Sequence, residues 1–216
     1  MADWLQQARR RALQYWAEDG LPDLYTGALL LLFVGLQAGG ERLFPAGWRG
    51  AEQGGALVVL VLGTLLARPV LRALKQRITY PRTGYVAYRT PSLAEQRQGL
   101  FFTVGLAVVL LALAVLTPDW PTPTALWLTH GVFFAITAAL AARLGLPRYW
   151  GYATLLLLAA GFYTLTWETW PAAWHDALAA GLPTLALLGL VMLLSGAWTL
   201  ARYLQRYPVW SGEAEL

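Results

Sequence analysis

Three residues of this 216-residue chain could take part in acid–base or metal chemistry: His130, Glu168 and His175. His130 falls inside a long apolar stretch, where an ionisable side chain is by default a candidate for function. Two interpretations are open for it. It is either a neutral, buried imidazole bonded to a carbonyl or hydroxyl, or a residue that binds a ligand or haem or carries a proton. Glu168 and His175 follow in a more polar segment, and these three residues are the catalytic candidates.

The spacing of these candidates matches no common catalytic or metal-binding motif. His175 adjoins Asp176, and the other acids near it, Asp119 and Glu168, belong to separate segments without an HExxH spacing. The chain has no cysteine, which excludes disulfides, thiolate-bound zinc and iron–sulfur clusters. No nucleophile elbow, phosphate loop or dinucleotide fingerprint occurs. We therefore predict no cofactor and no metal site, and an enzyme acting at the outer membrane face is kept as an alternative.

The elements that would position these residues are apolar. Hydrophobic residues make up 57% of the chain and charged residues 13%, about half the charged share of a soluble domain. Only helices and closed barrels satisfy their backbone in lipid, and alternating barrel strands are absent. The predicted fold is therefore all-α, a polytopic bundle of six transmembrane helices in one domain, residues 1–216. The six apolar stretches are residues 24–38, 54–71, 99–117, 123–142, 150–167 and 182–202.

The positive charges predict the orientation of this bundle. When the stretches alternate across a bilayer from a cytoplasmic N-terminus, 14 of the 16 Lys and Arg residues lie on the cytoplasmic side, and only Arg42 and Arg49 lie outside. Both termini are then cytoplasmic, and the expected location is a bacterial cytoplasmic (inner) membrane. The net charge of +4 is concentrated in the cytoplasmic loops, which indicates anionic lipid head groups rather than nucleic acid as partners.

Several segments outside the apolar stretches have patterns of their own. Residues 1–20 have helical amphipathic spacing and predict a helix lying in the cytoplasmic interface or packed on that end of the bundle. Gly35 and Gly39 form a GxxxG pair that indicates either a close helix contact or a helix end. The three inward-running helices end in similar Leu-Ala-Arg sequences, which suggests three repeated hairpins or merely the common requirement for Arg at such ends. Residues 207–216 form a cytoplasmic tail.

The longest polar connection, residues 75–98, is basic and rich in tyrosine. Its runs 78–80 and 85–88 favour strands, and the four residues between them predict a hairpin turn. The segment Ile78-Thr-Tyr-Pro-Arg-Thr-Gly-Tyr-Val-Ala-Tyr-Arg89 resembles a Tyr-Pro-Arg-x-Gly-Tyr-Val pattern of uncharacterised bacterial multi-pass membrane proteins, over about twelve residues. The resemblance implies no particular activity. The residues that we expect to contact anionic lipid or a protein partner are Arg77, Tyr80, Arg82, Tyr85, Tyr88 and Arg89.

These patterns favour a non-enzymatic membrane protein, an accessory, scaffold or interaction subunit that contacts another membrane protein or a second copy of itself. Few ionisable groups fall in the apolar stretches, and proton or ion paths usually need them. A transporter or binder of a small apolar or lipid-like substrate needs no buried charge and is the first alternative. The outer-face enzyme is the second.

The orientation can be tested with reporter fusions. Fusions after Gln53, Asp119 and Trp170 should report an external position, and fusions after Arg89, Arg148 and Leu216 should report a cytoplasmic one, because the arginines retain their loops in the cytoplasm. The fusion after Leu216 is decisive, because six helices that alternate across the bilayer from a cytoplasmic N-terminus must end in the cytoplasm.

Overall fold

The computed structural model describes residues 16–43, 49–83, 122–175, 178 and 181–208. These residues are helical and include no strand. The long helices are α2 (Leu21–Leu43), α3 (Arg49–Ile78), α6 (Thr122–Leu144), α7 (Pro147–Thr166) and α9 (Leu182–Arg206). The short elements are α4 (Tyr80–Thr83) and the 3₁₀ turns η1 (Trp167–Thr169) and η2 (Ala172–Trp174).

Three of these helices are long and apolar enough to cross a membrane, judged by length and composition: residues 21–39, 126–144 and 182–206. The all-helical fold class and the membrane assignment of the sequence are confirmed at this level. Helices α3 and α7 coincide with two further predicted stretches. The stretch at 99–117, most of the N-terminal segment and the tail beyond residue 208 lie outside the described residues, so the count of six and the hairpin repeat stay predictions.

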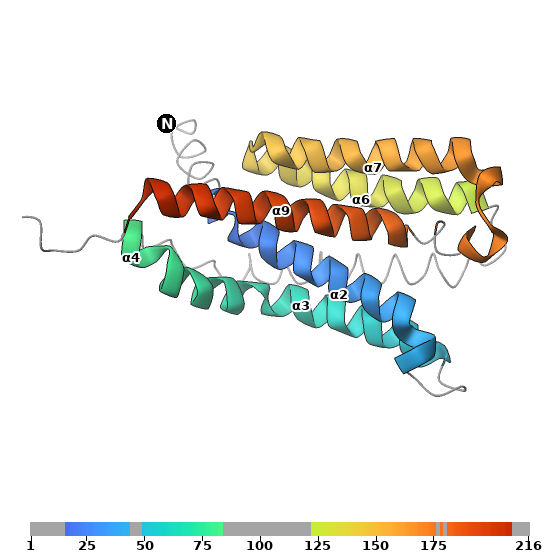
Figure 1. The fold of residues 1–216 in the computed structure, drawn as a ribbon, viewed down its shortest axis with the longest axis horizontal. Helices are drawn as coiled ribbons and strands as arrows, with labels where there is room; N and C mark the ends of the chain where they lie inside the picture. The colour runs from blue at the N-terminus through green and yellow to red at the C-terminus, as the bar shows by residue number, and fades with distance from the viewer. Residues whose placement is uncertain (1–15, 44–48, 84–121, 176–177, 179–180, 209–216) are drawn as a thin grey trace, which may run out of the picture.

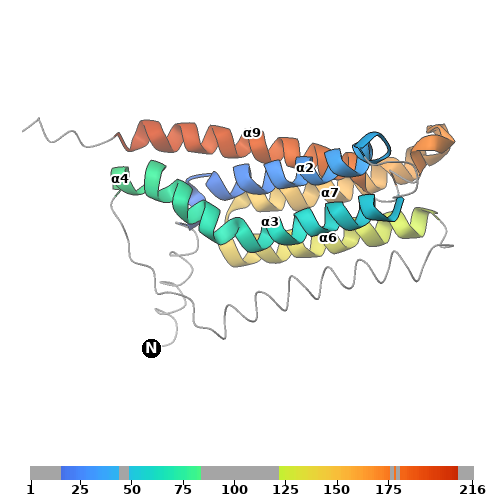
Figure 2. The same cartoon turned by 90° about the horizontal axis from the view of Figure 1, so that it is seen from below.

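The long helices pack in the order α3, α2, α9, α7, α6, with α2 against α9 and α6 against α7 as the most extensive pairs (Figures 1 and 2). Tyr149, Tyr152 and Leu156 of α7 pack with Leu188 and Met192 of α9 in the main apolar cluster. The starts of α2 and α7 and the ends of α3, α6 and α9 lie together at the left of Figure 1. We call this the basic end, because the last turns of α3, α6 and α9 there contain Arg77, Arg143 and Arg206.

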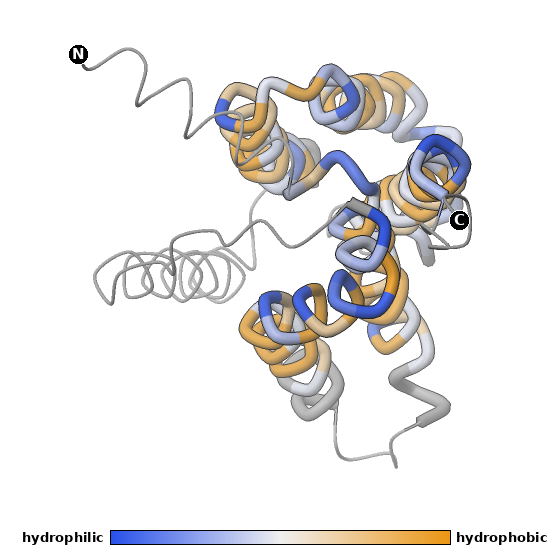
Figure 3. The backbone as a smooth tube through the Cα atoms, turned by 90° about the vertical axis from the view of Figure 1, so that its left-hand side faces the viewer, coloured by the Kyte–Doolittle hydropathy of each residue, from blue (hydrophilic) through white to orange (hydrophobic). Residues whose placement is uncertain are grey.

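The basic end is also the hydrophilic end. Figure 3 looks onto it and shows hydrophilic positions on the near parts of the helices, with hydrophobic positions behind them. Such a change along the helix axis is expected where a bundle leaves the hydrocarbon region for the head-group layer.

Helices α2 and α9 approach so closely that their backbones touch. A Cβ atom at Gly27 would lie 2.6 Å from the carbonyl oxygen of Gly189, and one at Gly189 would lie 3.0 Å from that of Gly27. Two turns along, Gly20 and Gly196 face each other in the same way. The glycines recur at seven-residue spacing on both helices, and small residues allow this close packing in membranes.

The GxxxG pair singled out in the sequence does not make this contact. A Cβ atom at Gly35 would have no neighbour within 4 Å. Gly39 lies inside α2, which continues to Leu43, so there is no helix end at Gly39 and, among the described helices, no close contact at Gly35. The close contact with α9 is made instead by Gly27 on α2 and by Gly20 in the turn just before it.

The predicted hairpin is wrong over its first strand. Helix α3 runs to Ile78, and residues 80–83 form the helical turn α4. The Thr79 N–H donates to the carbonyl of Lys75 at 2.9 Å, and the Arg82 N–H donates to that of Thr79 at 3.1 Å. These bonds continue the helical path through residues whose side chains favour strands, since tertiary context overrides strand propensity. The second run, 85–88, lies outside the described residues.

The α2–α9 contact yields a paired prediction. Gly27→Ala should lower the thermal unfolding midpoint in detergent, because its methyl group meets the backbone of α9 and overpacking costs about 1–3 kcal/mol. Gly35→Ala is the matched control and should be neutral or stabilising, since its methyl group meets open space and Ala favours a helix over Gly by about 1 kcal/mol. Equal shifts in the two variants would refute the close contact.

Candidate functional site

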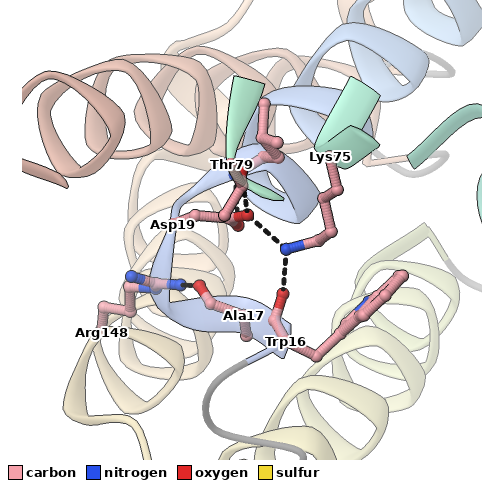
Figure 4. A network of polar contacts seen from close by, with 7 residues as sticks. Trp16, Ala17, Asp19, Lys75, Thr79 and Arg148 are labelled. Atoms are coloured by element: carbon pink, nitrogen blue, oxygen red, sulfur yellow. Dashed lines mark hydrogen bonds and ion pairs between the residues drawn. The ribbon is translucent and has the colours of Figure 1, made fainter. Parts of the chain in front are cut away.

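Two buried carboxylates stand at the start of α2. Asp19 and Asp23 are 1% and 0% exposed, and they lie four residues apart. One Asp19 oxygen, Oδ2, pairs with Lys75 Nζ and accepts a hydrogen bond from Thr79 Oγ1 at 3.0 Å (Figure 4). The other, Oδ1, accepts the backbone N–H of Leu21 at 3.2 Å. Both carboxylates lie at the N-terminal end of α2, Asp23 in its first turn and Asp19 just before it.

Lys75 is enclosed by the turn that precedes α2. Its Nζ donates to the carbonyl oxygen of Trp16 at 2.8 Å and lies 4.7 Å from the centre of the Trp16 ring. Burial lowers the pKa of Lys75 from its ordinary value, and the adjacent Asp19 carboxylate opposes that shift. The lysine, its carboxylate and the neighbouring carbonyl therefore satisfy one another within the chain.

Asp23 binds side chains of α7, as Asp19 binds side chains at the end of α3. Its Oδ2 lies 2.8 Å from Arg148 Nε, and it accepts hydrogen bonds from the hydroxyls of Tyr149 at 2.7 Å and Tyr152 at 3.5 Å. The Nε contact is an ion pair without the alignment of a hydrogen bond. Arg148 Nη2 also donates to the carbonyl of Ala17, as Figure 4 shows.

These contacts form one unit, which we call the Asp19–Asp23 cluster: Asp19, Asp23, Lys75, Thr79, Arg148, Tyr149 and Tyr152. It joins the turn at residues 16–20 and the start of α2 to the end of α3 and the start of α7. Trp16 and Ala17 are thus packed on the bundle, which over residues 16–18 agrees with the packed alternative for the N-terminal helix. Residues 1–15 lie outside the described part of the chain.

His130 belongs to α6, faces α9 and is 1% exposed. Its Nδ1 is 2.9 Å from the carbonyl oxygen of Leu126, and its Nε2 is 2.7 Å from Thr184 Oγ1. A carbonyl only accepts, so Nδ1 holds the proton and Nε2 accepts from the threonine hydroxyl. Tyr163 approaches the ring edge-on, with ring centres 6.2 Å apart. The geometry is that of the first interpretation, a neutral imidazole bonded to a carbonyl and a hydroxyl.

Glu168 and His175 lie in the segment after α7. Glu168 is exposed in η1, and His175 follows η2 and stacks on Trp167 with ring centres 4.3 Å apart. The Nε2 of His175 has no hydrogen-bond partner among the described residues. No described contact joins either side chain to His130, and the described residues contain no group of three His, Asp or Glu side chains placed to hold a metal ion.

The predicted lipid- or partner-binding residues divide into different environments. Arg77 is exposed on α3, and Tyr80 is half-buried in α4. Arg82 turns inward instead, and its Nη1 donates to the carbonyl oxygens of Tyr207 at 3.1 Å and Leu204 at 3.5 Å. It thereby caps the end of α9. Tyr85, Tyr88 and Arg89 lie outside the described residues.

The Asp19–Asp23 cluster escaped sequence reasoning, although two signals pointed to it. Asp19 and Asp23 are spaced to share one helix face at the border of the first apolar stretch. Lys75 is the only lysine of a chain that otherwise uses arginine. The positive-inside bias depends on Lys and Arg and hardly on acids, so the charge distribution that predicts the topology does not indicate the carboxylate partners of Lys75 and Arg148.

Removing only one partner of the Asp19–Lys75 ion pair should strongly destabilise the folded protein. We expect Lys75→Met to destabilise the protein by about 3–5 kcal/mol, because it leaves a buried carboxylate without its cation. Adding Asp19→Asn should recover part of that loss, and SDS-induced unfolding followed by circular dichroism measures both. Arg72→Met removes an exposed cation from the same helix and should change stability by about 0.5 kcal/mol or less. A loss in Lys75→Met no larger than in Arg72→Met would contradict the pairing.

Comparison of the chain with protein-family models, curated proteins and solved structures returned no match. Its function is therefore inferred from its own side chains and their contacts.

Proposed function

We propose that this chain is a non-enzymatic integral membrane protein that acts as an accessory, scaffold or interaction subunit. It crosses a bacterial inner membrane six times, with both termini and the basic end in the cytoplasm. The Tyr-Pro-Arg segment at that end contacts anionic lipid or a protein partner.

One observation carries the proposal. The buried ionisable residues of the described bundle, Asp19, Asp23, Lys75 and His130, are each bonded to a partner from the same chain. Groups engaged in this way hold helices together and are not presented to a substrate. What the described helices do present outward is apolar, including Val58 on α3, Leu158 on α7 and Leu194 on α9, which are 55%, 66% and 64% exposed.

The placement of the helix ends supports the proposed threading. Helices α2 and α7 begin at the basic end, and α3, α6 and α9 finish there (Figure 1). Arg148 at the start of α7 contacts Ala17 before α2, and Arg82 after α3 contacts the end of α9. Four helix ends far apart in the sequence, those of α3, α6, α7 and α9, thus bring cations to one side, as alternation across a bilayer requires.

A second candidate function is the binding or transport of a small apolar or lipid-like substrate. A groove of about 370 Å³ between α2 and α3 favours it. The groove is lined almost entirely by apolar side chains, and its volume falls within the range of small-molecule sites. The outer-face enzyme has no comparable support, because His130 is engaged with Leu126 and Thr184.

Photo-crosslinking in native membranes tests the interaction role. A photoreactive residue placed in turn at Val58, Leu158 and Leu194 samples an exposed face of α3, α7 and α9. At least one position should give a discrete adduct with one particular membrane protein, or with a second, differently tagged copy of this chain. The same group at Leu156, which is 1% exposed, is the control and should react only within the chain. Adducts with lipid alone at all three faces would overturn the proposal.

A further inference from the structure

The groove between α2 and α3 is partly open to its surroundings. Tyr25, Ala28, Leu29 and Leu32 of α2 line one wall, and Val59, Leu62, Gly63 and Leu66 of α3 line the other. The two polar atoms at its floor satisfy each other, since the Tyr25 hydroxyl donates to the Gly63 carbonyl oxygen at 2.6 Å. The groove therefore offers hydrocarbon surface without an unpaired polar group, which suits an alkyl chain.

A strip of α3 leads from this groove to a cation. Leu66, Val70, Ala73 and Arg77 follow one another at helical spacing and so share one face. Val70, Ala73 and Arg77 are exposed. Arg77 makes no ion pair with any residue that the structure describes, whereas the nearby Lys75 and Arg82 are occupied by Asp19 and by the end of α9. The apolar strip therefore ends at Arg77, an exposed cation that can bind an anionic group.

The length of the strip matches one leaflet of a bilayer. At the helical rise, about 16 Å of helix separates Leu66 from Arg77. Half of a typical hydrocarbon core is about 15 Å. An alkyl chain whose head group lies at the level of Arg77 would therefore run along α3 and reach the groove at Leu66, its nearest lining residue on this helix.

We propose that the α2–α3 groove and Arg77 bind one anionic phospholipid from the leaflet at the basic end, with an acyl chain in the groove and the phosphate at Arg77. Charge complementarity selects this occupant, because the apolar strip that leaves the groove along α3 ends at an exposed cation, Arg77. The site holds whether the protein is an interaction subunit or a transporter, so it does not depend on the crosslinking result above. In this proposal Arg77 contacts the lipid phosphate directly, whereas Arg82 binds the carbonyl oxygens at the end of α9 and stabilises the fold.

Lipid retention by the purified, full-length protein tests the site. The protein is incubated in detergent with equal amounts of phosphatidylglycerol and phosphatidylcholine and repurified, and the retained lipids are quantified by mass spectrometry. Wild type should retain phosphatidylglycerol in preference. Arg77→Gln should lower that affinity about fivefold, the equivalent of about 1 kcal/mol for one cation near the surface. Arg72→Gln, the matched control, removes an exposed cation on another face of α3 and should leave the affinity unchanged.

A second variant tests the chain-binding part. Ala28 lines the groove and is exposed, so Ala28→Phe fills the groove without entering the core. It should reduce retention of both lipids, with helicity by circular dichroism unchanged. Equal affinities of Arg77→Gln and Arg72→Gln, or wild-type retention by Ala28→Phe, would overturn the proposal. Displacement of the lipid by millimolar inorganic phosphate would overturn it as well, since the site would then recognise phosphate without the acyl chain.

Discussion

The arrangement of the basic end depends on two buried ion pairs, Asp19 with Lys75 and Asp23 with Arg148. A carboxylate removed from water must be paired and hydrogen-bonded, and here each one is. Each cation also donates to a carbonyl of the turn before α2, Lys75 to Trp16 and Arg148 to Ala17. The start of α2 is consequently locked to α3 on one side and to α7 on the other, and the cluster positions three helices at once.

A different interaction holds α2 to α9. Between these helices the glycines at 27 and 189 bring backbone against backbone, and no side chain fits between them. Further along α9, Thr184 reaches across to His130 on α6. The helices are thus joined by two kinds of contact, close packing at the glycines of α2 and α9 and paired polar groups that link α2 to α3 and α7 and α6 to α9. The bundle is held by contacts that work in lipid, where apolar side chains gain little from leaving their surroundings.

The cations of the basic end serve two distinct purposes. Lys75, Arg148 and Arg82 are directed into the protein, where they bind carboxylates and backbone carbonyls. Arg77 and Arg143 are exposed at this end, and Arg68 and Arg72 are exposed earlier on α3. The buried charges therefore hold the described helices together, and the proposed recognition role would belong to the apolar faces and exposed arginines on the outside of the bundle.

The sequence by itself determined the all-helical fold class and the five apolar stretches that the described long helices occupy, because apolar composition and run length leave a chain in lipid few alternatives to helices. It also marked His130 as buried and polar. It could not determine which cations face inward, since Arg77 and Arg82 belong to the same basic segment and differ only in what lies across from them. Nor could it show that Gly27 rather than Gly35 makes the close contact with α9. It also could not show that residues 78–80, which favour strands, lie at the end of α3 and the start of α4. The tertiary structure decides which cations turn inward, which glycine makes the contact and which conformation residues 78–80 adopt. The physical reason is that the carboxylate, carbonyl or backbone surface that each of them contacts belongs to another segment of the chain.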